Sequence, residues 1–243
     1  MSEWQHSESS EDAPIALDYE CTWPSEVLRL LQSDETAQAD RSTLAKQLDA
    51  MVNHRNIVGY QCTRLHPDEI PALELRGLLP LTPELHRERV RRRVAAGDLL
   101  PDLAECLLQK SLAGDQRSRA GLIHLILTKG GPESFWHFFR YWGGEALYFP
   151  HISNSSVIEQ VLSAIGLPCI LEVTIPISAL GHRTAADGLI FSYLVRRGDT
   201  NIRETGTHAV VKVPTRVLRV IQYGSQDFQT FTGPVSWPRP IHP

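Results

Sequence analysis

The spacing of hydrophobic residues predicts a series of helices in the first half of the chain. Residues 27–31 and 44–51 carry apolar side chains at helical spacing, which indicates two short helices. Pro67-Asp68-Glu69 is a typical helix start, with proline in the first turn and acids near the positive end, and Gly77 is placed to end that helix. Two further helices are expected over residues 83–96 and 101–113.

Short β-branched and apolar runs predict strands, most of them in the second half. The run 57–63 is an early one, and 121–128 is the strongest. The other expected strands are 145–149, 169–175, 189–195, 209–213 and 217–223. Helices are expected to begin at Pro132 and at the capping box Ser156-x-x-Glu159. Helices early and strands late, without βαβ alternation, favour an α+β fold with largely antiparallel pairing.

Charge is distributed unevenly over the 243 residues. Residues 1–50 hold three Lys/Arg and eleven Asp/Glu, a net charge of −8, whereas the remaining residues carry +4 of the total of −4. We therefore expect a disordered acidic tail over residues 1–20. It would be followed by a helical appendage over 21–55, a main domain over 56–230 and a Pro-rich tail over 231–243.

The four cysteines, at positions 21, 62, 106 and 169, form no C-x-x-C pair. This spacing argues against a zinc ribbon or a disulfide scaffold, and it favours reduced thiols in a cytoplasmic protein. No apolar run reaches the ~20 residues of a membrane helix, and the first residues do not have the pattern of a secretory signal. The histidines form no H-x-x-x-H or H-E-x-x-H pattern, so no metal site is expected.

Several of these segments together resemble the ADP-ribosyltransferases of the diphtheria-toxin and poly(ADP-ribose) polymerase type. The strand Tyr60–Arg64, the helix 67–76 and then Gly77-Leu78 resemble the opening of that family. Residues 144–149, a glycine followed by a strand ending in Tyr-Phe, look like its second motif. Residues 169–173 and 214–223 are similar to later strands of the family.

This resemblance implies both a fold and an activity. The fold would be α+β, with an ADP-ribosyltransferase-like pair of antiparallel sheets after the helical N-terminal appendage. The activity would be that of a toxin-like transferase of the glycosyltransferase class. Such an enzyme cleaves the nicotinamide–ribose bond of its substrate NAD and transfers ADP-ribose to a macromolecular acceptor, either protein or nucleic acid.

The first strand would supply contacts to ribose and phosphate. Gln61 stands where the family has a histidine that hydrogen-bonds the nicotinamide ribose, and an amide can both donate and accept such bonds. Thr63 would contact the ribose and the amide of nicotinamide, and Arg64 would bind phosphate through its guanidinium group. The alternative interpretation of Arg64 is that it is an ordinary surface charge after a strand.

The second motif and a later loop would supply the remaining groups. Tyr148 would stack on nicotinamide, and Gly144 would let the backbone approach the ligand closely. Glu204 is the first choice for the carboxylate that stabilises positive charge on the sugar in the transition state, and Glu145 is the reserve. Taken alone, Tyr148 is more often a core aromatic and Glu204 an exposed loop acid.

An arginine cluster suggests a different class of function. Five arginines fall within residues 87–93, and the default reading is a solvated basic face. The alternative is a non-catalytic binding protein on the same scaffold, which would use this basic helix to hold an anionic partner such as nucleic acid.

Overall fold

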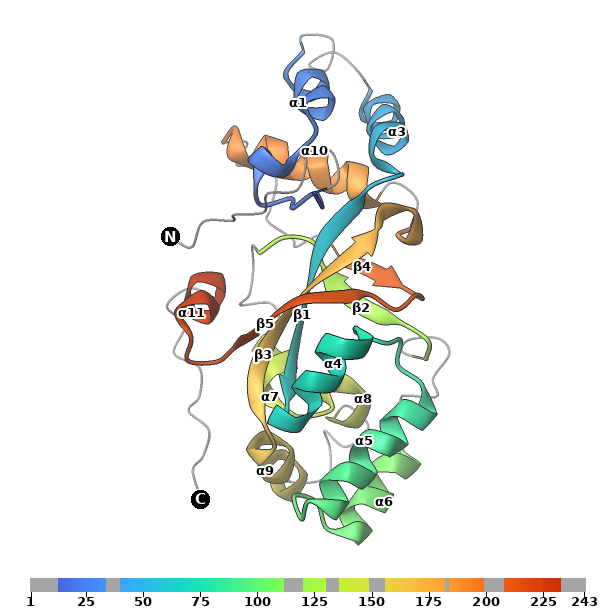
Figure 1. The fold of residues 1–243 in the computed structure, drawn as a ribbon, viewed down its shortest axis with the longest axis vertical. Helices are drawn as coiled ribbons and strands as arrows, with labels where there is room; N and C mark the ends of the chain where they lie inside the picture. Colours follow the sequence, from blue (N-terminus) through green and yellow to red (C-terminus); the bar gives the residue numbers. More distant parts are fainter. Residues whose placement is uncertain are drawn as a thin grey trace. The chain divides into compact units, whose positions relative to one another are not determined.

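The computed structural model describes residues 13–33, 40–111, 120–129, 136–148, 156–181, 184–198 and 208–232. The chain divides into two compact units. Unit 1 comprises residues 1–60, 125–130 and 174–210, and unit 2 comprises residues 61–124, 131–173 and 211–243. Figure 1 shows the elements of both units, which are considered one at a time below.

The elements follow one another as short helices and a few strands. The α-helices are α1 (Ser25–Gln32), α3 (Arg41–Val52), α4 (Ile70–Arg76), α5 (Pro83–Ala95), α6 (Pro101–Gln109), α7 (Trp136–Arg140), α8 (Gly144–Tyr148), α9 (Ser156–Ala164), α10 (Thr184–Arg196) and α11 (Gln226–Thr232). The 3-10 helices are η1 (Glu20–Thr22), η2 (Pro67–Glu69) and η6 (Ile177–Ala179). The strands are β1 (Asn56–Leu65), β2 (Ile123–Ile126), β3 (Leu167–Pro176), β4 (His208–Val211) and β5 (Arg216–Gln222).

The strands of the described residues form one sheet in the order β4-β2-β1-β3-β5. β1 pairs antiparallel with β2, with Tyr60 opposite Ile126. On the other side of β1, the Ile177 N–H donates to the Arg55 carbonyl at 2.9 Å, which joins the end of β3 to the start of β1. The mixed helix and strand content agrees with the predicted α+β class. The pair of sheets that the family resemblance implies is not found in the described residues.

Unit 1 is organised around three helices. Helices α3 and α10 pack against each other, and α1 also contacts α3. Residues 15–17 lie buried in this unit, although they were expected to belong to a disordered tail. The Ile15 N–H donates to the Asn56 carbonyl at 2.9 Å, and the Ile15 carbonyl accepts from the Val58 N–H at 2.8 Å. The apolar triplet Ile15-Ala16-Leu17 thus pairs with β1, which overrides the polar composition around it.

Helix α10 corrects the prediction of a strand over residues 189–195. Ala185, Ala186, Leu189 and Ile190 are buried, which places them on one side of a helix at spacings of one and four residues. A short apolar run is compatible with a strand or with a buried helix, and periodicity alone does not separate the two. Here the alanines and the packing against α3 extend the helix through the whole run.

Unit 2 has a hydrophobic core that is shared by four helices. Its buried members come from α5, α6, α8 and α9 and from the turns beside them: Val90, Leu99, Ala104, Leu107, Tyr141, Trp142, Leu147, Ile158, Leu162 and Ile165. A second contact in this unit joins α7 to α11, where the rings of Phe139 and Phe228 meet edge to face at 5.4 Å. Beside β3 and β5, the Tyr223 N–H donates to the Pro168 carbonyl at 2.9 Å.

The strand predicted over residues 145–149 is wrong, because residues 145–148 belong to helix α8. Gly143 and Gly144 have φ angles of +79° and +55°, and so make a turn that side-chain-bearing residues rarely adopt. The Trp142 N–H donates to the Leu162 carbonyl at 2.9 Å, which fixes this turn beside α9. Leu147 is then fully buried in the core of unit 2. Burial of Leu147 on a helical turn decides against the strand.

The other predicted elements are confirmed within a few residues at their ends. Strands β1 to β5 correspond, in this order, to the strands predicted at 57–63, 121–128, 169–175, 209–213 and 217–223. Helices α1 and α3 correspond to those predicted at 27–31 and 44–51, and η2 with α4 to the one at 67–76. Helices α5, α6 and α9 correspond to those predicted at 83–96, 101–113 and 156–165. The start of the helix predicted at Pro132 lies outside the described residues, which include its later part as α7.

Gly77 ends α4 and brings the following residue onto β5. Its φ is +75°, and its N–H donates to the Leu73 carbonyl at 2.9 Å. Leu78 and Thr215 then exchange two backbone hydrogen bonds, of 2.8 and 2.9 Å. A Cβ at position 77 would collide with the Thr215 carbonyl oxygen. Two constraints therefore require glycine at position 77: the positive φ angle, and the Thr215 backbone, which leaves no space for a Cβ.

We predict that Gly77→Ala destabilises the protein more than Gly97→Ala does. Gly97 also has a positive φ, of +83°, but an added Cβ there meets no atom within 4 Å. The control should lose about 1–2 kcal/mol through its dihedral angle alone, and Gly77→Ala should lose at least about 1 kcal/mol more through the collision. Urea unfolding of both variants measures the difference, and equal losses would contradict the close approach of Leu78 to Thr215.

Candidate functional site

A buried carboxylate lies where β1 leads into α4 in unit 2. The Glu69 side chain is 9% exposed and accepts three hydrogen bonds. These come from Nε of Arg89 at 2.6 Å, from Nε1 of Trp142 at 2.8 Å and from the backbone N–H of His66 at 2.8 Å. The guanidinium carbon of Arg89 also lies 5.1 Å from the centre of the Trp142 ring. Three segments distant in sequence therefore meet at one carboxylate.

Arg93 forms a second buried charge in the same region. Its side chain is 1% exposed, and its guanidinium group donates to Asp98 at 2.8 Å and to Asp68. Both aspartates remain partly exposed, so the ion pairs reach from the interior of unit 2 to its surface. Nε of Arg93 and Nη2 of Arg89 are buried and have no hydrogen-bond partner among the described residues.

His66 lies between the two aspartates and is partly exposed. Its Nδ1 is 2.9 Å from Oδ1 of Asp68 and 3.4 Å from the Asp68 backbone nitrogen. Its Nε2 lies 3.9 Å from Oδ2 of Asp98. The imidazole is therefore within reach of both aspartates that pair with Arg93.

The pKa values of both carboxyls that precede α4 lie below their usual range. Burial of Glu69 favours its protonated form, but the charge and hydrogen bond of Arg89 outweigh burial and lower the pKa. For Asp68, burial acts in the same direction and is outweighed by the hydrogen bonds and charges of Arg93 and His66. Both groups therefore stay ionised at neutral pH, and their contribution to stability is lost when the pH falls through these lowered values.

His86 is a buried, uncharged imidazole on the same helix as these arginines. It is 2% exposed, and neither ring nitrogen has a hydrogen-bond partner among the described residues. Burial, followed by the positive charge of Arg89, lowers its pKa to about 4. The ring is therefore neutral at physiological pH, and protonation would place an unpaired charge in the interior.

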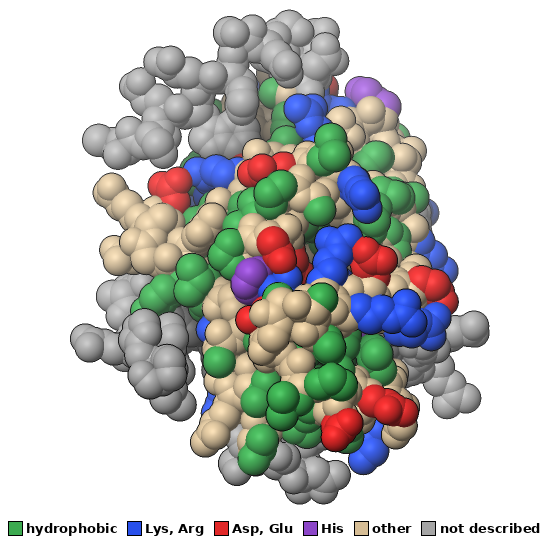
Figure 2. All heavy atoms as spheres, turned by 60° about the horizontal axis from the view of Figure 1, so that its bottom comes forward, with side chains coloured by type: hydrophobic (Ala, Val, Ile, Leu, Met, Phe, Trp, Pro, Cys, Tyr) green, Lys and Arg blue, Asp and Glu red, His purple; other side chains and the backbone are tan. Residues whose placement is uncertain are grey.

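The arginines of α5 are mostly paired with acids and do not form a basic face. Besides Arg89 and Arg93, Arg87 is 2.7 Å from Glu84, and Arg92 is 2.6 Å from Glu88. In Figure 2, which turns the lower part of Figure 1 forward, acidic and basic side chains lie next to one another. Arg91 is the member of the cluster without an ion pair to a described residue. This pairing removes most of the charge that an anionic partner would recognise.

The candidate NAD-binding residues of β1 fall into two classes. Gln61 and Thr63 are partly exposed, while Tyr60, Cys62 and Arg64 between and beside them are buried. Arg64 donates through Nε to the Ile165 carbonyl at 2.8 Å and through Nη1 to the Phe139 carbonyl at 3.3 Å. Burial lowers the pKa of Arg64 to about 10, so the group remains charged. Its guanidinium thus connects β1 to two backbone segments of unit 2.

The other candidate residues are only partly described. Gly144 begins α8, and Glu145 and Tyr148 lie on that helix, with side chains outside the described part of the structure. Glu204 lies outside the described residues. The structure therefore brings Gln61 and Thr63 together on β1, and it places Gly144 and Tyr148 on a helix where a strand was expected.

Sequence reasoning missed the residues that build the buried polar groups of unit 2. The sequence identified Glu69 as an acid at the start of a helix, but no sequence pattern indicated that its side chain is buried. Glu172 on β3 is also buried, and Arg219 on the adjacent β5 lies 3.0 Å from it and 2.7 Å from Asp227. Such pairs depend on which strands are neighbours, and sequence spacing does not reveal this.

Metal-ligating residues or reactive thiols would be alternative kinds of site. They contain no group of three or more His, Cys, Asp or Glu residues arranged to hold a metal ion. All four cysteines are free. Burial raises the pKa of Cys62 strongly and that of Cys169 to about 11, so neither thiol is an activated nucleophile.

Comparison of the chain with protein-family models, with curated proteins and with solved structures found no match. None of the helices in the described segments is long and apolar enough to cross a membrane. The functional assignment therefore depends on the residues and their geometry.

We predict that Glu69→Gln destabilises the protein by about 3 kcal/mol, the cost of breaking a buried ion pair. The substitution keeps the shape of the side chain but leaves Arg89 without its counter-charge. Glu84→Gln is the matched control, because its ion pair with Arg87 is exposed and should contribute less than about 1 kcal/mol. Denaturant unfolding at neutral pH measures both values. Similar small losses would show that the Glu69 ion pair contributes no more than a surface pair.

We also predict that His86→Leu reduces the loss of stability in mild acid. The folded pKa of His86, about 4, lies below the usual value of 6.5. The unfolded chain therefore binds more protons between these pH values, and stability falls as the pH drops from 6.5 toward 4. The shift corresponds to at most about 3 kcal/mol.

Unfolding free energies of wild type and His86→Leu, measured at several pH values, test this prediction. The difference between the two curves should grow below pH 6.5 in favour of the variant. Parallel curves would contradict a buried neutral histidine. Replacement of the exposed His54 by leucine provides a control for a change in histidine number alone.

Proposed function

We propose that this protein is an NAD-dependent ADP-ribosyltransferase that modifies a macromolecular acceptor. The observation that carries the proposal is the alternation on β1, which leaves Gln61 and Thr63 partly exposed between buried neighbours. The order of elements supports it as well: β1, η2 with α4, the Gly77-Leu78 stop, and the pairing of Leu78 with Thr215 just before β5. The strand, the helix, the Gly77-Leu78 stop and the closing strand follow one another as the family resemblance led us to expect.

In this proposal the ligand contacts come from two elements. The amide of Gln61 and the hydroxyl of Thr63 exchange hydrogen bonds with the nicotinamide ribose and the carboxamide. Gly144 allows close approach of the backbone, and Tyr148 at the end of α8 supplies the ring that stacks on nicotinamide. Arg64 takes a supporting role, because its guanidinium group already donates to the carbonyls of Ile165 and Phe139.

The reaction breaks the bond between C1′ of the ribose and the nicotinamide nitrogen. The bonding electrons leave with nicotinamide, whose ring becomes neutral, and positive charge develops on the sugar. A carboxylate close to the sugar stabilises that charge, and we assign this role to Glu204, with Glu145 as the alternative. The nucleophilic atom of the acceptor then bonds to C1′ and loses its proton. A cytoplasmic setting, expected from the free cysteines, would supply NAD.

We predict that the purified chain releases nicotinamide from NAD and that Glu204→Gln lowers kcat by about 10²–10³, the usual effect of removing one transition-state-stabilising group. Tyr148→Ala should raise KM, and it should weaken NAD binding measured by calorimetry. Glu88→Gln on α5 is the control of equal charge change, since Glu88 lies on a surface ion pair. Chromatography of the products of labelled NAD measures these rates.

Three outcomes separate the possible interpretations. Loss of activity in Glu145→Gln with retention in Glu204→Gln would move the catalytic carboxylate to α8. Binding of NAD without nicotinamide release, in the presence of a protein or nucleic-acid extract, would identify a non-catalytic binding protein on the same scaffold. Neither binding nor release would overturn the proposal.

A further inference from the structure

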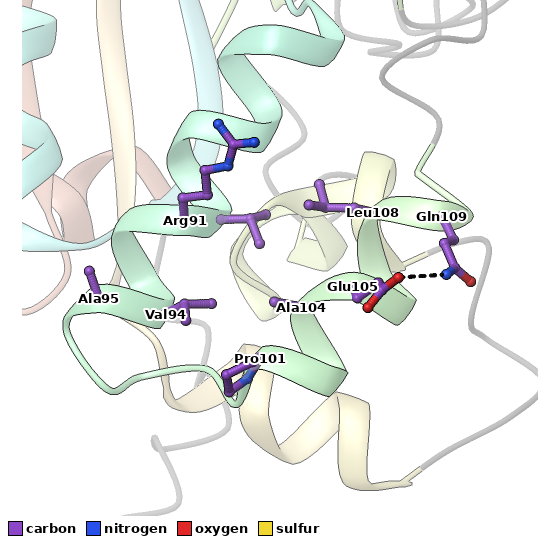
Figure 3. A pocket seen from close by; sticks show the side chains of 9 residues that line it. Arg91, Val94, Ala95, Pro101, Ala104, Glu105, Leu108 and Gln109 are labelled. Atoms are coloured by element: carbon purple, nitrogen blue, oxygen red, sulfur yellow. Dashed lines mark hydrogen bonds between the residues drawn. The ribbon is translucent and has the colours of Figure 1, made fainter.

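An apolar groove lies between the two helices of the α5–α6 hairpin in unit 2. It has a volume of about 570 Å³, and Val90, Val94, Ala104 and Leu108 contribute to its lining. Ala95 and Pro101 lie at the end near the connecting loop (Figure 3). Leu100, which precedes α6, is 73% exposed. The hairpin thus presents apolar surface on the side where its two helices meet.

The apolar lining belongs partly to the core of unit 2 and partly extends beyond it. Val90 and Ala104 are buried members of that core, whereas Val94 and Leu108 are only partly buried and pack against it. Apolar side chains at positions 90, 94, 101, 104 and 108 recur at spacings of three, four and seven residues along their helices. Val94 and Leu108 remain partly exposed and Pro101 is exposed, so this row leaves apolar surface on the hairpin, as is typical of helices that contact further helices.

The two walls of the groove carry opposite charges. Arg91 lies on the α5 wall, and Glu105 lies on the α6 wall, where it accepts a hydrogen bond from Gln109 at 3.3 Å. Figure 3 shows the Arg91 side chain extending away from Glu105 of the same chain. Neither residue forms an ion pair with another described residue, and the neighbouring Arg87 and Arg92 are neutralised by Glu84 and Glu88.

We propose that this groove is the contact surface of a homodimer, in which a second copy of the hairpin covers it. A two-fold axis along the groove places α5 of each chain over α6 of the other. Arg91 of one chain then faces Glu105 of the other, and the same pair forms twice by symmetry. The four helices form an antiparallel bundle, in which neighbouring helix dipoles oppose one another.

The charges favour a second copy over an unrelated partner. A face with one basic and one acidic wall is complementary to itself under this rotation. A second copy of the chain therefore already carries the complementary charges. A face built from one short hairpin is small beside the ~800 Å² that each partner buries in a standard interface, so the dimer should be weak and depend on concentration. The groove shares no residue with the proposed NAD site, so the two proposals can fail independently.

Charge reversal tests the dimer through the full-length chain. Sedimentation velocity of the wild type should show a monomer–dimer equilibrium that shifts with concentration. Arg91→Glu places two acids opposite each other, and Glu105→Arg places two arginines opposite each other. Each variant alone should therefore raise the dimer Kd at least about tenfold, equivalent to ~1.4 kcal/mol.

The decisive sample is an equal mixture of the two variants. In a mixed dimer, the glutamate introduced at position 91 of one chain meets the arginine introduced at position 105 of the other. The unchanged Glu105 of the first chain meets the unchanged Arg91 of the second, so dimerisation should return to the wild-type level. The double variant Arg91→Glu with Glu105→Arg should likewise dimerise as the wild type does. Glu74→Arg and Arg76→Glu on α4 are controls that change the same charges outside the groove.

Circular dichroism of each variant verifies that the chain is folded, which is expected because Arg91 and Glu105 are both exposed. A monomeric wild type at high concentration would overturn the proposal and leave the groove to a helix of another protein. Single variants that dimerise as the wild type does, or a mixture that stays monomeric, would overturn the assigned geometry. Charge-reversed variants that retain nicotinamide release would support a dimer surface that is independent of the NAD site.

Discussion

One buried carboxylate, Glu69, determines how the polar interior of unit 2 is arranged. It receives hydrogen bonds from α5, from the turn that precedes α8 and from the end of β1, through Arg89, Trp142 and His66. An ionised carboxylate is costly to remove from water unless its acceptor positions are filled. Each of these three segments must therefore be in place before the carboxylate is accommodated. This requirement links the strand to the helices that carry the hydrophobic core.

The five arginines of residues 87–93 show how a charge run is divided by helical geometry. Arg89 and Arg93 are four residues apart and share the inward side of α5, where they meet Glu69 and Asp68. Arg87 and Arg92 point to the surface and pair with acids on the same helix. Arg91 alone of the five remains without an ion pair to a described residue and lies at the groove. The run is thus chiefly structural, which weakens the case for an anion-binding face.

The two proposals draw on different parts of unit 2. The transferase proposal uses β1 and α8, where Gln61 and Thr63 remain accessible and Gly143 and Gly144 form a sharp turn. The dimer proposal uses the groove between α5 and α6. Trp142 connects the two regions, because its ring belongs to the core of the helices and its Nε1 donates to Glu69. A change in this interior would affect both regions through stability rather than through chemistry.

Local physical chemistry was sufficient to predict β1, the helix after it and the Gly77 stop, together with α5, α6, α9 and β3. In these elements the periodicity, the capping residues and the glycine all favour the same structure, so no distant contact is needed to choose it. The candidates for ligand contact on β1 came from the family resemblance and not from local patterns. The alternative interpretation of Arg64 as a surface charge was wrong, because its side chain is buried.

Only the tertiary structure decided α8 and α10, because a short apolar run suits a strand and a buried helix equally until its packing partners are known. It also decided the polar partners: Glu69 and Trp142 are 73 residues apart, and Arg64 and Ile165 are 101 apart. The free energy of a buried charge depends on which groups surround it in space. The sequence specifies the charges, and the fold specifies the neighbours that stabilise them.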